Sequence, residues 1–482
     1  MIPYVIKSFR GGVSDENKRG ISGSFKYGQS LDIHSRDDVL MCGSSVVTVD
    51  SSTITDLIQF MIPSTDGSMY CFGSAGSIYS VAGDKNDPAV NFVYNDEAGN
   101  ILGAAEFQGS DGITYMHWST ASQVSRRDMS TGEKAVPWTN VSALYKTEKI
   151  SSSAVWHTMK VASGQLNIAN AEGLASLSFA GDFDPFDLNI RPGNLINCIE
   201  ERDDYILLGS QKLGGDEEGH LWSWITTATN WVQKKKIPIQ GINSIIDTEL
   251  KLLQGGDDGE IFFSDLVNSV PIASVPGGGR TNPGGVTIHN DLALFGFYGG
   301  TYPGLWSYGR KNKNRPFALN YSYRLAATVA GSSVSSIGAV TEFNGIPFAS
   351  WGTTDGSTSD YGIDAVSSTT KASAIYEGLE FDGGNPHLAK TVDTIALLMS
   401  PLPSGTSVSA KFKLDKETDW RYAVLGDNAT TFSVTNEIIA LFNVGKPGRI
   451  YEVGIELNAS GASTPSVQAI ISYLSKENYE FS

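Results

Sequence analysis

A hairpin pattern that recurs along the chain limits most strongly what this sequence can fold into. The clearest copy, at residues 205–224, reads YILLGSQKLGGDEEGHLWSW. Two runs of strand-forming residues flank a turn rich in Gly and Asp, which is the signature of a β-hairpin. Residues 250–264 and 292–308 repeat the arrangement. In all three, a glycine and at most one spacer residue precede an aliphatic residue and a bulky aromatic one.

Weaker copies extend the repeat in both directions. The marker at the start of the second hairpin strand is a glycine in six copies and Ser122 in the seventh. The markers stand at positions 76, 122, 173, 219, 259, 304 and 362. Their mean spacing of roughly 48 residues is typical of propeller blades. Residues 195–199 and 242–246 add a further strand before two of the hairpins.

The repeat predicts an all-β chain with an about seven-bladed β-propeller over residues 41–385. If so, Trp222, Phe262 and Trp306 occupy equivalent, buried positions in the strand after the marker. Unrelated hairpins in a sandwich are the alternative, because no WD-type dipeptide fixes the repeat.

The two ends of the chain do not follow the pattern. Residues 386–482 carry about six short strands, some with strict alternation, which predicts a C-terminal β-sandwich after a linker at Gly383, Gly384 and Pro386. Residues 1–40 are interpreted as an N-terminal arm along the propeller or a neighbouring subunit. A first strand that closes the last blade is the alternative.

Charge and cysteine usage narrow the class of protein. With 35 Lys and Arg against 52 Asp and Glu, the net charge of −17 disfavours a surface that wraps nucleic acid. The three cysteines are far apart, and Cys71 and Cys198 lie in apolar runs, so we expect buried thiols, suited to assembly in a reducing cytoplasm. No run resembles a signal peptide or a membrane-spanning helix, and we expect a soluble protein.

No motif for catalysis is visible. The six histidines lack metal-ligand spacing, and nothing in the sequence pairs the many carboxylates at a fixed separation. The glycine-rich loop at 275–285 lacks the Lys-Ser/Thr ending of a phosphate-binding loop. Acidic segments at 182–187 and 215–219 could hold calcium, with acidic turns as the alternative. The sequence therefore predicts no catalytic, cofactor-binding or metal-binding residues and a protein that is not an enzyme.

Two basic clusters are the candidate contact residues. We interpret them as possible contacts with an acidic partner subunit or with DNA, and a solvated loop is the alternative. They comprise Lys234, Lys235 and Lys236, and, in the segment RKNKNR, Arg310, Lys311, Lys313 and Arg315.

Segments at the two ends of the chain carry a resemblance to a known family. Phe9-Arg10-Gly11-Gly12 is a common opening in phage structural proteins, and residues 390–395, the strand at 408–414 and the turn Gly448-Arg449-Ile450 are similar to a C-terminal phage β-sandwich. With its arm, propeller and sandwich, the chain resembles the tail hub or nozzle proteins of short-tailed bacteriophages, also called packaged-DNA stabilisation proteins.

The resemblance implies a virion component that is assembled in the host bacterial cytoplasm. It would form a hexameric ring at the end of the tail tube, contact other tail or head–tail connector proteins, and pass double-stranded DNA at ejection. A phage tail-fibre or receptor- or glycan-binding propeller protein is the alternative.

Charge leads to an expectation for such a ring. A channel that passes DNA must not bind it tightly, and each Lys or Arg of the wall that pairs with a phosphate strengthens the binding of the DNA. We therefore expect an acidic or neutral channel wall, with the basic clusters at subunit or partner contacts. The alternative is that the clusters line the channel and grip the DNA until ejection.

Overall fold

The fold consists of β-strands joined by turns. The computed structural model describes residues 2–14, 23–36, 38–83, 87–138, 156–170, 173–212, 218–326, 334–355, 358–384 and 386–476, and none of these is helical. The all-β prediction is confirmed. The chain divides into two compact units. We call Val47–Gly304 with Leu325–Ala365 the propeller unit, and Met1–Val46, Leu305–Arg324 and Val366–Ser482 the terminal unit.

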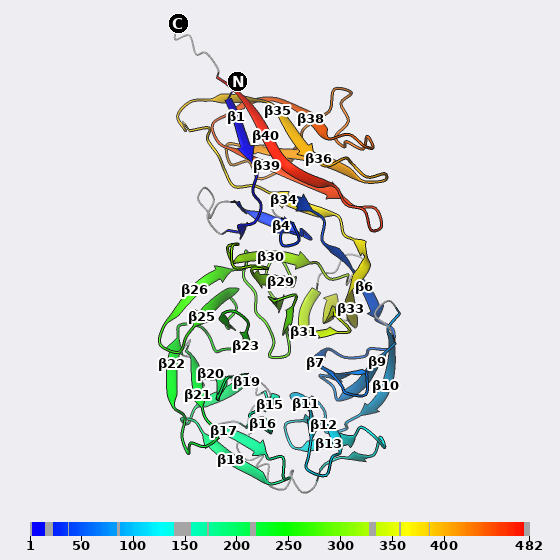
Figure 1. The fold of residues 1–482 in the computed structure, drawn as a ribbon, viewed down its shortest axis with the longest axis vertical. Helices are drawn as coiled ribbons and strands as arrows, with labels where there is room; N and C mark the ends of the chain where they lie inside the picture. Colours follow the sequence, from blue (N-terminus) through cyan, green and yellow to red (C-terminus); the bar gives the residue numbers. More distant parts are fainter. Residues whose placement is uncertain are drawn as a thin grey trace. The chain divides into compact units, whose positions relative to one another are not determined.

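Five four-stranded antiparallel sheets in the propeller unit are built from strands consecutive in sequence. Figure 1 shows them around a common centre, with the first strand of each nearest to it. Their strands are β7 (Ile58–Pro63), β8 (Met69–Gly73), β9 (Ser77–Ala82) and β10 (Ala89–Asn95); β11 (Gly103–Gln108), β12 (Thr114–Ser119), β13 (Val124–Asp128) and β14 (Lys134–Ala135); β15 (Met159–Ala162), β16 (Gln165–Asn170), β17 (Gly173–Leu177) and β18 (Phe183–Asn189); β19 (Asn194–Arg202), β20 (Tyr205–Lys212), β21 (Gly219–Trp224) and β22 (Gln233–Ile237); β23 (Ser244–Asp247), β24 (Lys251–Gln254), β25 (Glu260–Ser264) and β26 (Ser269–Ser274).

Two further sets of strands complete the repeat. Next along the chain are β27 (Val286–His289) and β28 (Leu292–Phe297) in the propeller unit, then β29 (Gly304–Gly309) and β30 (Ala318–Tyr323), which the division assigns to the terminal unit. The last sheet contains β31 (Val334–Phe343), β32 (Ile346–Asp355) and β33 (Thr358–Lys371), with β6 (Ser44–Asp50) as its outer strand. The outer strand of the last blade therefore comes from residues 44–50. The alternative for residues 1–40, a first strand that closes this blade, is not what the structure shows, because the strands of that segment belong to the terminal unit.

The hairpin markers identify the repeat correctly. Each marker lies at the start of, just before or within the third strand of its set, from β9 through β13, β17, β21, β25 and β29 to β33. Trp222, Phe262 and Trp306 lie in three of these third strands and are 0, 2 and 0% exposed. The prediction of equivalent, buried positions is confirmed, and with it the propeller.

Backbone geometry explains one marker glycine directly. Gly76 has a φ of +97°, and a Cβ at this position would lie 2.3 Å from the Asp96 carbonyl oxygen. Only glycine adopts this conformation without strain and leaves the space that the neighbouring backbone occupies.

Two sheets of the terminal unit share one apolar core. The first sheet contains β1 (Ile2–Ile6), β40 (Ser466–Lys476), β35 (Lys390–Met399), β38 (Ile439–Gly448) and the short β5 (Leu40–Met41). The second continues from β30 through β4 (Tyr27–Gln29), β34 (Ala374–Glu377), β39 (Tyr451–Asn458), β36 (Ser407–Leu414) and β37 (Arg421–Tyr422). A short parallel pair joins β2 (Gly12–Val13) to β3 (Ser24–Phe25). Phe25, Tyr376, Ile395, Phe442 and Ile455 are buried in the common core. A β-sandwich also has two sheets over one core, and the C-terminal β-sandwich over residues 386–482 stays a prediction.

The expected boundaries differ from the observed ones at the N-terminus. Residues 1–40 do not form a separate arm: β1 pairs with β40 from Ile2↔Leu474 to Ile6↔Ile470, and Phe9 and Phe25 are buried in the core. Residues 366–384 also belong to the terminal unit. Residues 305–324 are grouped with the same unit, although β29 and β30 lie in one sheet with β27 and β28 and complete that blade. The physical reason is that the apolar side chains of the N-terminal segment are buried against strands that lie far away in the sequence, such as β40.

The buried tryptophan of β21 should be a major contributor to stability. Trp222 is fully buried, donates its indole N–H to Ser210 Oγ at 2.8 Å and packs edge-on against Trp231. Trp222→Ala should lower the free energy of unfolding by about 3–5 kcal/mol because it leaves a large cavity. Urea unfolding followed by circular dichroism measures this. Val270→Ala, at an exposed position of β26, is the matched control and should change stability by less than about 0.5 kcal/mol. Equal effects of the two substitutions would contradict the blade assignment.

Candidate functional site: two cavities at the centre of the propeller

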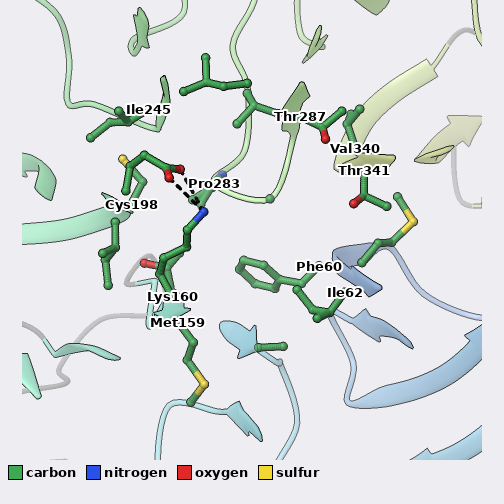
Figure 2. A pocket seen from close by; sticks show the side chains of 18 of the residues that line it. Phe60, Ile62, Met159, Lys160, Cys198, Ile245, Pro283, Thr287, Val340 and Thr341 are labelled. Carbon is green, nitrogen blue, oxygen red and sulfur yellow. Dashed lines mark hydrogen bonds and ion pairs between the residues drawn. The ribbon is translucent and has the colours of Figure 1, made fainter. Parts of the chain in front are cut away.

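A cavity of about 460 Å³ lies at the centre of the propeller unit (Figure 2). We call it the apolar cavity because most of its lining residues are apolar, although three charged residues and three threonines line it too. Its wall comes mainly from the inner strands of successive blades. The lining residues are Phe60, Met61, Ile62, Pro63, Ala104, Thr158, Met159, Lys160, Cys198, Ile199, Glu200, Ile245, Ile246, Asp247, Pro283, Gly284, Val286, Thr287, Ile288, Val340 and Thr341.

The charged side chains of the apolar cavity are paired. Lys160 Nζ lies 3.1 Å from both carboxylate oxygens of Glu200, the contact drawn in Figure 2. Asp247 is paired with Arg202 at 3.4 Å. Burial raises the pKa of the Cys198 thiol, so this cysteine stays protonated and is a poor nucleophile. Nothing among these lining residues combines a nucleophile with a neighbouring base.

A second cavity, of about 300 Å³, is rich in side-chain amides, and we call it the amide cavity. It shares Pro283 with the apolar cavity, so the two are neighbours. Several of its residues come shortly before an inner strand. They are Gln59, Asn100, Leu102, Trp156, Gln211, Asn243, Arg280, Thr281, Asn282, Pro283 and Tyr298.

Hydrogen bonds fix one side of the amide cavity. The Tyr298 hydroxyl donates to Asn282 Oδ1 at 2.7 Å, and Asn282 Nδ2 donates to the Ile337 carbonyl at 2.9 Å. Burial raises the pKa of Tyr298, so its hydroxyl remains a neutral donor. Arg280 Nη1 lies 3.3 Å from Asp257 Oδ1, which balances the charge of the one cation in the lining.

The other side of the amide cavity keeps unused hydrogen-bonding capacity. Gln59 Oε1 and Asn100 Oδ1 are buried, and within the described part of the chain neither has a hydrogen-bond partner. Gln59 as a residue is only 9% exposed. A buried polar atom without a partner costs free energy. Both oxygens are closed off from the cavity in this conformation, and a rotation of either amide group would turn its oxygen toward a polar ligand or water.

The first predicted basic cluster is engaged within its own blade. Lys234, Lys235 and Lys236 lie on the outer strand β22. Lys234 Nζ lies 4.6 Å from the centroid of the Trp222 ring, Lys235 Nζ donates to the Val267 carbonyl, and Lys236 pairs with Glu218. None of the three lines either cavity.

The second predicted cluster lies in the loop between β29 and β30, in the terminal unit. The Arg310 guanidinium stacks on Phe317 at 4.5 Å, and Arg315 Nη1 donates to the His34 carbonyl. Lys311 and Lys313 are exposed. The structure does not bring the two clusters into one unit, and their role as partner or DNA contacts stays a prediction.

The histidines and acidic segments give no reactive site in the part of the chain that the structure describes. His117, His157 and His220 are buried in or beside blade strands. In the segment 182–187, residues 183–187 belong to strand β18 rather than to an acidic turn, and Asp187 accepts hydrogen bonds from Ser176 and Gln165. Residues 215–217 of the other segment lie outside the described residues. No three His, Cys, Asp or Glu among the described residues form a metal-binding group. No described helix could cross a membrane.

Sequence reasoning missed the amide cavity because its residues are separated by up to about 240 positions and share no motif. One signal was available. Asn100, Asn243 and Asn282 each come one to four residues before an inner strand, β11, β23 and β27. Alignment of the repeats on their inner strands would have placed these three amides at one end of the propeller.

Comparison with known proteins does not assign the chain to a family. No protein-family model and no curated protein matches the chain. Among solved structures, the extracellular domain of a protein described as a hybrid two-component system of B. thetaiotaomicron has a TM-score of 0.48 at 13% identity, over 94% of this chain and 62% of that one. The WD40 propeller domain of Doa1 has a TM-score of 0.44 at 8% identity, over 66% of this chain and 96% of that one. The C-terminal WD40 domain of Sif2 has a TM-score of 0.41 at 10% identity, over 67% and 99%.

The buried histidines should make the stability of the protein depend on pH. Burial lowers the pKa of His117 to about 3 and that of His157 to about 4, against 6.5 for a free histidine. Below about pH 6.5 the unfolded chain takes up protons at these positions and the folded chain does not. The free energy of unfolding should therefore fall as the pH drops from about 6.5 toward about 4.

Urea unfolding at about pH 7 and about pH 5 measures this dependence. His117 packs among aromatic side chains, so His117→Phe is the informative variant. It removes one titrating group and should lose less stability between the two pH values than the wild type. Identical losses in the two proteins would contradict the assignment of His117.

Proposed function

We propose that the protein is a structural, non-catalytic subunit of a bacteriophage virion. Specifically, it forms the tail nozzle or hub of a short-tailed phage, as a hexameric ring that closes the tail channel and passes double-stranded DNA at ejection. The observation that carries the assembly part of this proposal is an apolar face on the first sheet of the terminal unit.

This outer sheet face contains seven apolar residues in two rows, of which Ala396 and Ala469 are only 5% and 3% exposed. Strand register places Val5, Ile471, Ala396 and Leu441 side by side across four strands. The adjacent row contains Ala469, Leu398 and Ile439. Val5, Leu398, Ile439 and Leu441 are 36–55% exposed, whereas the residues between them along the strands point into the core. A contiguous apolar face of this kind is typical of an interface.

A second copy of this chain is the occupant that we propose for the outer sheet face. Copies that each carry −17 repel one another through their charged surfaces. Self-association therefore needs a contact without charge, and none of the seven side chains is ionisable. Burial of this face between copies supplies the attraction.

Two further observations support the nozzle proposal. Phe9 to Gly12 and residues 390–395, on which the resemblance partly rests, belong to the same unit, so the two ends of the chain form one module. The charged side chains of the apolar cavity are paired and its cysteine is buried, in keeping with a non-catalytic role. In the ring, the basic clusters contact neighbouring subunits or tail proteins and the channel wall is acidic or neutral.

A receptor- or glycan-binding propeller of a phage tail is the second candidate function. The amide cavity favours it, because unpartnered amide oxygens at the centre of a propeller suit a small polar ligand.

The outer sheet face should control assembly. We expect the purified protein to form rings, visible by negative-stain electron microscopy, with a mass from sedimentation velocity that is a multiple of 51.6 kDa. Leu441→Asp places a carboxylate in the face and should give monomers of unchanged circular dichroism, because a buried unpaired charge is costly. Val270→Asp, at an exposed apolar position of the propeller, should leave the rings intact. A monomeric wild-type protein in assembled particles, or rings that persist in Leu441→Asp, would refute the proposal.

The protein should also lack hydrolytic activity. Incubation with bacterial polysaccharides and peptidoglycan, followed by measurement of reducing ends, should give no release above buffer. The apolar cavity has Glu200 as its most obvious carboxylate, so Glu200→Gln is the decisive comparison. Saccharide release by the wild type that is abolished in this variant would identify an enzyme.

A further inference from the structure

We propose that the amide cavity is a binding site for a neutral saccharide unit. The site combines amide groups from several blades, two aromatic rings and a volume suited to one sugar ring. This inference goes beyond the structural role and does not depend on it.

The hydrogen-bonding groups of the cavity suit hydroxyl groups. Gln59, Asn100, Gln211 and Asn243 line the cavity with uncharged amide groups, each of which has donors and an acceptor. Part of this capacity is already used, because Gln211 Oε1 accepts from Asn197 and both polar atoms of Asn282 are bonded within the protein. A hydroxyl group is likewise both a donor and an acceptor. A ring with several hydroxyls can therefore satisfy several of these amides at once.

Buried polar atoms indicate that the site is built for a polar ligand. Gln59 Oε1 and Asn100 Oδ1 are buried and lack a partner among the residues that the structure describes. A buried polar atom that lacks a hydrogen-bond partner destabilises the folded protein. Both oxygens have almost no exposed surface, so a ligand hydroxyl that donates to either one first requires the amide group to turn toward the cavity.

Other ligand classes fit less well. An apolar ligand would leave the Gln59 and Asn100 oxygens unsatisfied. A calcium or magnesium ion prefers carboxylates, and no lining residue is acidic. A phosphate group or an acidic sugar would need a free cation, whereas Arg280 is already paired with Asp257 at 3.3 Å. A neutral, hydroxylated ligand remains.

Aromatic side chains and the size of the cavity complete the site. Trp156 and Tyr298 line it, and Trp156 is fixed edge-on to Phe60 at a centroid distance of 5.9 Å. An aromatic ring offers an apolar surface to the C–H groups of a sugar while its polar atom can still hydrogen-bond. A volume of about 300 Å³ is at the lower end of ligand cavities, which suits one sugar ring rather than a long chain.

The test uses the full-length protein and a defined panel of sugars. Glucose, galactose, mannose and N-acetylglucosamine represent neutral rings, and glucuronate represents an acidic one. Saturation-transfer difference NMR detects binding, and isothermal titration calorimetry gives Kd. Asn243→Ala removes a half-buried amide with little expected effect on folding, and Gln59→Leu removes the buried one. Lys160→Met, in the apolar cavity, is the matched control.

We expect at least one neutral sugar to bind in the millimolar range. Loss of a hydrogen-bonding amide should then weaken binding by about three- to tenfold in Asn243→Ala and Gln59→Leu, whereas Lys160→Met should bind as the wild type does. Absence of binding by every sugar, binding of glucuronate alone, or equal Kd values in Asn243→Ala and the wild type would overturn the proposal. These outcomes leave ring formation untouched, so the two proposals fail separately.

Discussion

Pairing between the first strands of the chain and strands made from its last quarter is the constraint on which the rest of the structure depends. The terminal unit requires β1 beside β40, and the last blade requires β6 in the sheet of β31, β32 and β33. Each contact closes a loop of roughly 300–470 residues, whose entropic cost grows only slowly with length. In the closed ring of blades, the inner strand of each blade lies next to the inner strands of the two neighbouring blades. The inner edges of the sheets are therefore protected.

The two cavities show how one propeller centre can have two chemical characters. Where the inner strands begin, side chains such as Asn243 and Asn282 present amides; along the strands, Phe60, Ile199 and Ile245 present hydrocarbon. Within the apolar cavity, the opposite charges of Lys160 and Glu200 compensate each other. In a purely structural subunit this centre would bind no ligand, whereas in a binding protein the amide cavity would hold one. The structural proposal and the saccharide proposal therefore concern different parts of the same chain.

Local patterns predicted the blades well, and long-range pairing explains what they missed. Gly76, Gly219 and Gly259 mark the start of third strands. The tight turns and close contacts that require glycine at these positions involve residues only about 20 positions away in the sequence. Alternation in the N-terminal segment says that Val5 and Tyr4 face opposite sides, but not that β40 lies beside them. The outer sheet face and the amide cavity are likewise assembled from distant segments, so neither is visible in a single stretch of sequence.

The pairing of β1 with β40 also orders events during synthesis. At the usual pace of translation, β1 leaves the ribosome on the order of tens of seconds before its partner exists. Blades whose strands are consecutive in sequence can form meanwhile, each within its own stretch of chain. During that interval the backbone N–H and C=O groups of the N-terminal strands are unpaired, and they can form hydrogen bonds with strands of other chains. Synthesis of β40 ends this exposure, and a ribosome that stops before β40 is made releases a chain with both sheets of the terminal unit open to misassembly.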